Sequence, residues 1–219
     1  MKNKFGFILI KPQLGENIGA CARSMKNFGF SKLNIVSPKF TFPNHKTKTT
    51  SVGAYDIINK AKVYKNTNDA INEFDIIVSL SARKRDINKR NISIQEFLKI
   101  VKKKNQSKFG LMFGPEASGL TNKDISFSNF ILTIPTSKKF KSLNLSHSVT
   151  VICYEIFKLF NRDKFYNKRS GTKVSSKSKL SSVVNHLVNL LDAKNFFLPH
   201  EKKEAMILNI NNLIYRLEP

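Results

Sequence analysis

The chain has 219 residues, enough for one medium-sized domain with an appendage and a buried core. Its 38 basic and 15 acidic side chains give a formal net charge of +23, which favours a polyanionic partner, although a lysine-rich compositional bias alone also produces such a charge. Two cysteines without metal-ligand spacing and the lack of any long apolar stretch argue against a disulfide scaffold, a metal site and a membrane span.

Short apolar runs separated by helical patterns predict an α/β fold. Between the first two runs, apolar residues at helical spacing predict a helix that stops near Gly29. Further helices are expected over Ile94 to Val101 and from after Leu143 to about Phe160. This alternation predicts a mainly parallel sheet with helices on both faces. The expected strands are Phe5 to Ile10, Leu33 to Val36, Ile76 to Leu80, Leu111 to Phe113 and Phe130 to Ile134.

The last quarter of the chain differs from the rest in composition and in its apolar pattern. Asn161 to Lys179 is rich in serine and lysine, has no sustained apolar period and reads as a flexible basic linker. Two amphipathic helices are expected after Leu180, with Pro199 in the joint between them. The predicted organisation is therefore a domain over 1–160, a linker over 161–179 and a helical extension over 180–219.

Cys21 and Cys153 both fall within amphipathic helical patterns. We expect them to be small buried thiols of a protein in a reducing cytosol. The first apolar run reaches Lys11 and Pro12 too soon to be a signal peptide, so a cytoplasmic protein is expected.

Three polar or glycine-rich segments follow predicted strands. In Asn17 to Gly29, Asn17 suits a helix N-cap, and Arg23 is either a solvated arginine or a functional one beside small residues. In Phe113 to Leu120, glycines and Pro115 form a sharp turn with exposed backbone groups; a plain βα loop with Glu116 near the next helix start is the alternative.

The third segment is Ile134 to Ser146, in which Ser142 and Asn144 straddle a helix start. Ordinary helix capping explains this pair when it is taken alone. The order and spacing of all three segments carry more information than any one of them. Together they predict a site that grips a ligand with backbone groups.

The three segments resemble the motifs of the SpoU–TrmD (SPOUT) superfamily of RNA methyltransferases, in its TrmH-like 2′-O-ribose branch. The chain is most similar to TrmJ-like tRNA enzymes, and Ser79 to Asp86 also matches a TrmJ-like segment. The resemblance covers roughly residues 5 to 160. It implies a deep C-terminal trefoil knot, a homodimer and S-adenosylmethionine as the methyl donor.

The resemblance also implies the residues of the site. A pocket for the donor would comprise Leu80, Ser81, Ala82, Gly114, Ile134, Ser142, Leu143 and Asn144. The catalytic residues facing the reacting ribose would be Arg23, Asn17, Glu116, Ser142 and Asn144. Since guanidinium stays protonated, Arg23 is expected to stabilise a developing alkoxide or hold the adjacent phosphate, while Ser142 or a phosphate relays the proton.

A run of cations follows the strand that ends at Leu80. It is either a solvated charged loop or an RNA contact, and the carboxyl end of a strand is where open α/β sheets bind ligands. RNA phosphates are therefore expected to meet Arg83, Lys84, Arg85, Lys89 and Arg90, and the resemblance adds Arg23 to the RNA-binding residues.

The resulting functional hypothesis is methyl transfer to a ribose 2′-hydroxyl of tRNA, by resemblance at the pyrimidine of position 32 in the anticodon loop. An rRNA 2′-O-methyltransferase of the same family and a non-catalytic knotted RNA-binding protein stay open as alternatives. The C-terminal helices either bind RNA or pack on the catalytic domain.

Overall fold

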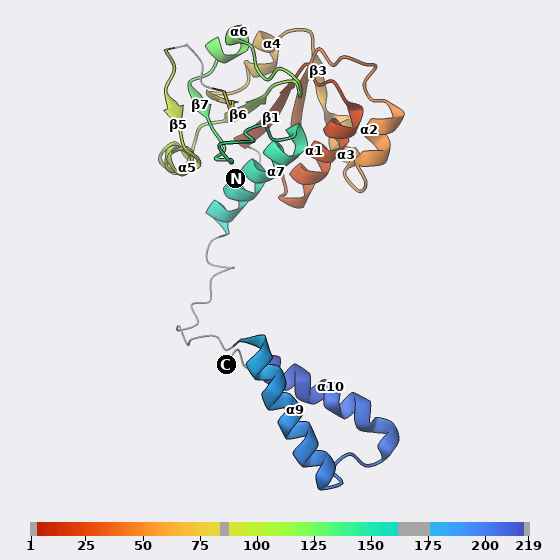
Figure 1. The fold of residues 1–219 in the computed structure, drawn as a ribbon. Coiled ribbons are helices and arrows are strands. Elements are labelled where there is room, and N and C mark those ends of the chain that lie inside the picture. Colours follow the sequence, from red (N-terminus) through yellow and green to blue (C-terminus); the bar gives the residue numbers. More distant parts are fainter. Residues whose placement is uncertain (1–3, 84–87, 162–175, 217–219) are drawn as a thin grey trace. The chain divides into compact units, whose positions relative to one another are not determined.

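The structure is a computed structural model that describes residues 4–83, 88–161 and 176–216. The chain divides into two compact units, Met1–Phe165 and Tyr166–Pro219. Figure 1 shows the first unit as a sheet with helices packed on it and the second as a helical hairpin.

A seven-stranded sheet with the order β3-β2-β1-β6-β4-β7-β5 forms the centre of the first unit, and all described pairings are parallel. The mainly parallel α/β sheet predicted from the sequence is thus confirmed. The five predicted strands are present within two residues at each end. The strands are β1 (Phe5–Ile10), β2 (Lys32–Val36), β3 (Lys62–Tyr64), β4 (Ile76–Leu80), β5 (Asn91–Ile92), β6 (Phe109–Phe113) and β7 (Phe130–Leu132).

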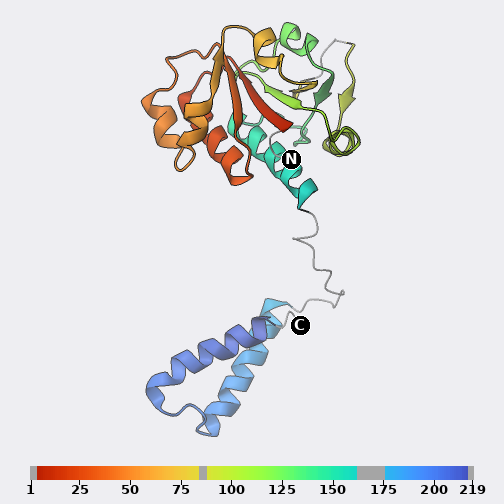
Figure 2. The same cartoon turned by 180° about the vertical axis from the view of Figure 1, so that it is seen from behind.

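Helices cover both faces of this sheet (Figures 1 and 2). The larger core lies under the first group of helices, α1 (Gly15–Asn27), α3 (Tyr55–Lys60), α5 (Ile94–Lys103) and α7 (Leu145–Phe160). A smaller core lies under the second group, α4 (Thr67–Ile71) and α6 (Asn122–Ser126). Short α2 (His45–Thr50) packs beside α1.

Strand β1 shows why both faces of the sheet carry apolar side chains. Its alternate residues Phe5, Phe7 and Leu9 face the larger core, and Ile8 and Ile10 face the smaller one. All six residues of the strand are buried, as expected for a strand covered on both sides.

Cys21 on α1 and Cys153 on α7 are buried free thiols where these two helices meet. Burial raises the pKa of both thiols far above its ordinary value, so neither is a reactive thiolate. The expectation of two buried structural cysteines is confirmed.

The second unit contains α9 (Lys177–Ala193), a 3-10 turn at His200–Lys202 and α10 (Lys203–Arg216). Val184 on α9 and Phe197 in the segment after it are buried, and Tyr215 of α10 shares a hydrogen bond of 2.8 Å with Ser181 of α9. In the described part of the chain, no helix combines the length and the apolar character that crossing a bilayer requires.

Gly19 allows α1 and α2 to approach closely. A Cβ there would overlap Oγ1 of Thr50 and lie 2.6 Å from the carbonyl oxygen of Thr47 and 2.9 Å from the amide nitrogen of Ser51. Two of these three atoms belong to the backbone and cannot rotate away.

We expect Gly19→Ala to lower stability by about 2 kcal/mol, because overpacking at this contact outweighs the gain in helix propensity. Thermal unfolding followed by circular dichroism should show a midpoint about 4 to 8 °C lower. Asn27→Ala, at an exposed position of the same helix, is the control and should change the midpoint little. A Gly19→Ala protein that melts higher than the wild type would show that α2 can move away at no cost.

Candidate active site

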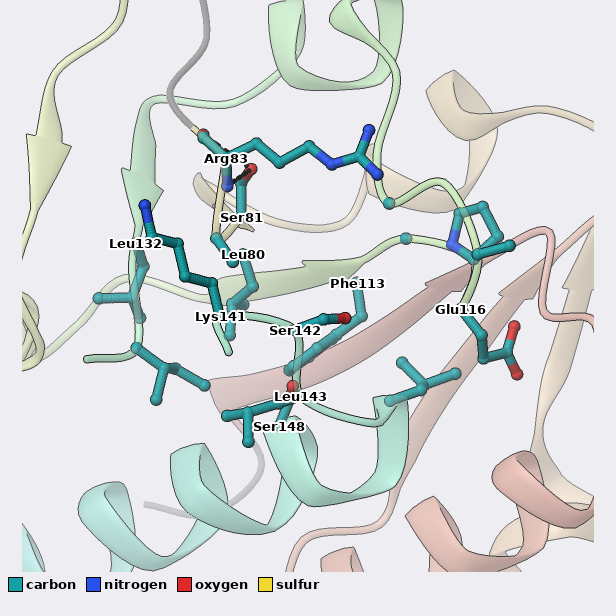
Figure 3. A pocket seen from close by; sticks show the side chains of 17 residues that line it. Leu80, Ser81, Arg83, Phe113, Glu116, Leu132, Lys141, Ser142, Leu143 and Ser148 are labelled. Atoms are coloured by element: carbon teal, nitrogen blue, oxygen red, sulfur yellow. Dashed lines mark hydrogen bonds between the residues drawn. The ribbon is translucent and has the colours of Figure 1, made fainter. Parts of the chain in front are cut away.

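A pocket of about 540 Å³ opens at the carboxyl ends of β4, β6 and β7. This is the edge at which open parallel sheets bind ligands. Figure 3 shows the side chains of three separate segments around one hollow. The lining residues are Leu80, Ser81, Ala82, Arg83, Phe113, Gly114, Pro115, Glu116, Ala117, Gly119, Leu132, Ile134, Lys141, Ser142, Leu143, Leu145 and Ser148.

The loop after β6 folds back on itself at Gly114. A Cβ on Gly114 would overlap the amide nitrogen of Leu120 and the carbonyl carbon of Gly119. The Gly119 N–H donates to the carbonyl of Pro115 at 2.8 Å, and Gly119 has a positive φ of 67°. Both glycines are therefore required for a compact turn that leaves backbone groups exposed to the pocket.

The loop between β7 and α7 forms the opposite wall. Ser142 and Leu143 come just before the helix, and Asn144 is its N-cap, accepting from the N–H of Ser146 at 2.8 Å. The capping role foreseen for Asn144 is confirmed. Because the cap fixes where α7 begins, it also fixes the two pocket residues that precede it.

A chain of hydrogen bonds joins the three motif segments beside the pocket. Asn17 Nδ2 donates to Glu116 Oε1 at 2.7 Å, and Asn144 Nδ2 donates to Asn17 Oδ1 at 3.1 Å. The second oxygen of Glu116 accepts from the N–H of Gln13 at 2.9 Å. The Ala117 N–H in turn donates to Gln13 Oε1 at 3.2 Å. The network ties the start of α1, the β6 loop and the start of α7 together.

Two alternatives from the sequence are wrong. Asn17 is not an N-cap, because α1 begins at Gly15 after Leu14 and Asn17 lies inside its first turn, only 7% exposed. Glu116 does not lie at the start of the next helix, α6. It lies at the start of α1, where its charge faces the positive end of a helix far away in sequence.

The structure brings together most of the predicted donor pocket. Seven of the eight residues line it, and Asn144 instead holds the network beside it. Of the residues predicted to act in catalysis, Glu116 and Ser142 line the pocket, and Asn17 is bonded to Glu116. Arg23 does not line it: this side chain is exposed on α1 and has no acidic partner within the described residues.

The predicted RNA-binding cations differ in their surroundings. Arg83 lines the pocket, and Figure 3 shows its guanidinium above the hollow. Lys89 donates to the carbonyls of Ser126 and Ser128, both at 2.9 Å, and Arg90 lies 3.4 Å from Glu96. Lys84 and Arg85 lie outside the described residues.

Several lining residues were missed by sequence reasoning. Five of them lie inside the two segments that the sequence singled out, next to residues that were predicted to line the pocket. They are Phe113, Pro115, Ala117, Gly119 and Lys141. Gln13 carries no such signal, because its role depends on a contact 103 residues away. Within the described residues, no group of three or more His, Cys, Asp or Glu side chains could hold a metal ion.

The family model described as the SpoU rRNA methylase family matches residues 4–154. The chain belongs to this family. The resemblance inferred from its motifs is thereby confirmed, and the fold is that of the SPOUT methyltransferases.

Similar proteins include tRNA methyltransferases. A tRNA (cytidine-2′-O-)-methyltransferase TrmJ of Methanocaldococcus jannaschii is 35% identical over 95% of this chain and 90% of its own length. The TrmJ of Sulfolobus acidocaldarius, with the same description, is 30% identical over 87% of this chain and 80% of its own length.

Solved structures show the same architecture. The crystal structure of TrmJ from Z. mobilis has a TM-score of 0.68 at 28% identity and covers 98% of this chain and 91% of that one. The SpoU methyltransferase AviRb of Streptomyces viridochromogenes, in complex with AdoMet, has a TM-score of 0.57 at 17% identity and covers 74% of this chain and 58% of that one. The AviRb likeness supports the fold.

Proposed function

We propose that the protein is an S-adenosylmethionine-dependent methyltransferase that modifies a ribose 2′-hydroxyl of tRNA. The observation that carries the proposal is the convergence of three loops on one pocket in a chain of the SpoU family. The two TrmJ relatives, whose names specify tRNA and the cytidine 2′-oxygen, favour this substrate.

The pocket suits a molecule of the size of S-adenosylmethionine. Its volume of about 540 Å³ falls in the range of small-molecule sites. Apolar side chains such as Leu80 and Leu132 stand beside exposed main chain at Gly114 and Ser142, a combination that suits a flat base and a polar sugar. When bound, the donor supplies an activated methyl group on sulfur.

The chain's own residues would hold the accepting hydroxyl and move its proton. Arg23 would stabilise negative charge developing on the 2′-oxygen or hold the adjacent phosphate through its planar fork. Ser142, at the pocket, would relay the proton, or an RNA phosphate would do so. Asn17, Glu116 and Asn144 would act by fixing the loops that carry these groups.

A homodimer explains how Arg23 reaches a pocket that it does not line. Arg23 is exposed on α1, and α1 packs beside α7, which carries the half-exposed Tyr154. Tyr154 stacks edge-on against Phe28 at 6.0 Å between ring centroids, so these helices offer an aromatic patch to a second copy. Each pocket would then receive Arg23 from the partner subunit.

The remaining parts of the proposal rest on the family likeness. They are the trefoil knot, a cytoplasmic location, and position 32 as the target. The division into a catalytic domain over 1–160, a linker over 161–179 and an extension over 180–219 rests on the change in composition, and α9 begins at Lys177, three residues before the expected start of the extension. For the extension, an RNA-binding role is favoured because the sequence before it carries seven cations and one acidic residue over 161–179.

The proposal is tested by incubating the full chain with labelled S-adenosylmethionine and an unmodified tRNA transcript. We expect label at one ribose, mapped by nuclease digestion and mass spectrometry, and none when that nucleotide carries a 2′-deoxyribose. Labelling of rRNA fragments but not of tRNA would favour the rRNA alternative. Absence of S-adenosylhomocysteine binding in calorimetry would indicate a non-catalytic RNA-binding protein.

A further inference from the structure

The loop between β7 and α7, residues 133–144, exposes an aromatic side chain beside the pocket. Phe140 is 77% exposed, the highest value for a large apolar side chain in the described part of the chain. It immediately precedes Lys141 and Ser142, which line the pocket. Figure 3 shows the long side chain of Lys141 at the edge of the hollow.

The backbone of the loop holds this ring outward. The Phe140 N–H donates to the carbonyl of Ser137 at 3.3 Å, and the Lys139 N–H donates to Ser137 Oγ at 3.3 Å. Oγ1 of Thr136 donates to the carbonyl of Lys141 at 3.4 Å. These bonds form a turn with Phe140 at its end, so the ring projects from a defined position.

The charges around the Phe140 ring indicate which class of molecule it binds. Lys138, Lys139 and Lys141 flank it and are exposed, and none of them has an acidic partner within the described residues. One flat apolar ring among cations is poorly suited to a protein interface, whose core is depleted of lysine. It matches single-stranded nucleic acid, which presents flat bases along a chain of phosphates.

We propose that Phe140 stacks on a base of the substrate RNA next to the nucleotide whose ribose enters the pocket, while Lys138 and Lys139 contact the neighbouring phosphates. This inference rests on the proposed function. Because every base has a flat face, stacking here positions the strand without selecting base identity. Phe140 would thus set the affinity for RNA and the register of the target nucleotide.

Steady-state kinetics test the role of the ring. Phe140→Ala should raise the KM for tRNA about tenfold, whereas Phe140→Tyr should keep it near the wild-type value. Calorimetric binding of S-adenosylhomocysteine should stay unchanged in both variants. Phe127→Ala, at a partly exposed phenylalanine after α6, is the control and should leave the KM for tRNA unchanged.

A fluorescence titration tests stacking directly, because the chain contains no tryptophan. Phe140→Trp places a single indole at the proposed contact, and we expect an unmodified tRNA transcript to quench its emission. The matched protein Phe127→Trp should show little change. This readout needs no turnover, so it separates the inference from the proposed function. The proposed function fails if the wild type does not methylate tRNA, whatever the emission of the indole shows.

Three results would overturn the inference. One is an unchanged KM for tRNA in Phe140→Ala. Another is steady indole emission from Phe140→Trp while a filter-binding assay shows that tRNA is bound. The third is a fall in the melting temperature or in the dimer mass of Phe140→Ala, measured by light scattering, because the ring would then pack within the protein.

Discussion

Arg23→Lys should lose at least about a hundredfold in the methylation rate while binding S-adenosylhomocysteine as the wild type does. Lysine keeps the positive charge but replaces the planar fork by a single ammonium group, which cannot bind a phosphate or an alkoxide in the same two-point geometry. Donor binding should survive because other residues line the donor pocket, and Arg23 is proposed to face the accepting ribose. Single-turnover methylation and calorimetry measure the two quantities separately.

Variants on the same helix distinguish a specific role of Arg23 from a general charge effect. Arg23→Gln should be at least as impaired as Arg23→Lys. Lys26→Gln removes a charge one turn further along α1, where Lys26 pairs with the exposed Asp56 at 2.6 Å, and should remain active. Near-normal turnover in Arg23→Lys would remove the guanidinium from the mechanism.

The sequence predicted the main strands and long helices because each buries a continuous apolar surface. β1 and β6 are apolar along their whole length, and α7 repeats apolar residues at helical spacing. β3 and β5 were missed because they are three and two residues long and lie at the sheet edges, where KVY and NI form no recognisable pattern. The short helices α2, α3, α4 and α6 were missed because each has only five or six residues, too few to show a helical apolar period.

The pocket was easier to predict than the network beside it. Leu80 ends β4, Ser81 and Ala82 follow it, and Gly114 follows β6, so the topology of a parallel sheet places them at one edge. Ser142 lies three residues before α7 begins. The bond between Asn17 and Glu116 joins residues 99 apart, and the bond between Asn144 and Asn17 joins residues 127 apart. A local sequence pattern cannot show which distant residue will bond to Asn17. The sequence therefore also allowed Asn17 to be interpreted as a helix N-cap.

Gly114→Ala should weaken the binding of S-adenosylhomocysteine at least tenfold. The added Cβ would overlap backbone atoms of Gly119 and Leu120 and lie 2.8 Å from the Cα of Gly119, and no side-chain rotation relieves that overlap. The turn must therefore open, which moves the main chain that lines the pocket from Gly114 to Gly119. Calorimetry should show at least a tenfold weaker affinity, with a melting temperature lowered by a few degrees.

Ser118→Ala, an exposed position in the same turn, is the matched control and should bind S-adenosylhomocysteine normally. Wild-type affinity in Gly114→Ala would mean that the turn tolerates a side chain and does not shape the pocket. Circular dichroism would show whether Gly114→Ala fails to fold. In that case Gly119→Ala tests the same turn, because Gly119 has a positive φ that alanine adopts only with strain.

Mixing the Arg23→Gln and Gly114→Ala proteins, assayed at a donor concentration too low to fill the Gly114→Ala pocket, tests whether Arg23 acts across a dimer. A dimer of one Arg23→Gln subunit and one Gly114→Ala subunit has one intact pocket, and that pocket faces the subunit that still carries Arg23. Random exchange should restore about a quarter of the wild-type sites, because half of the dimers are mixed and each has one working site. If Arg23 acted on its own subunit's pocket, no mixed dimer would contain a complete site, and the mixture would stay as inactive as its components.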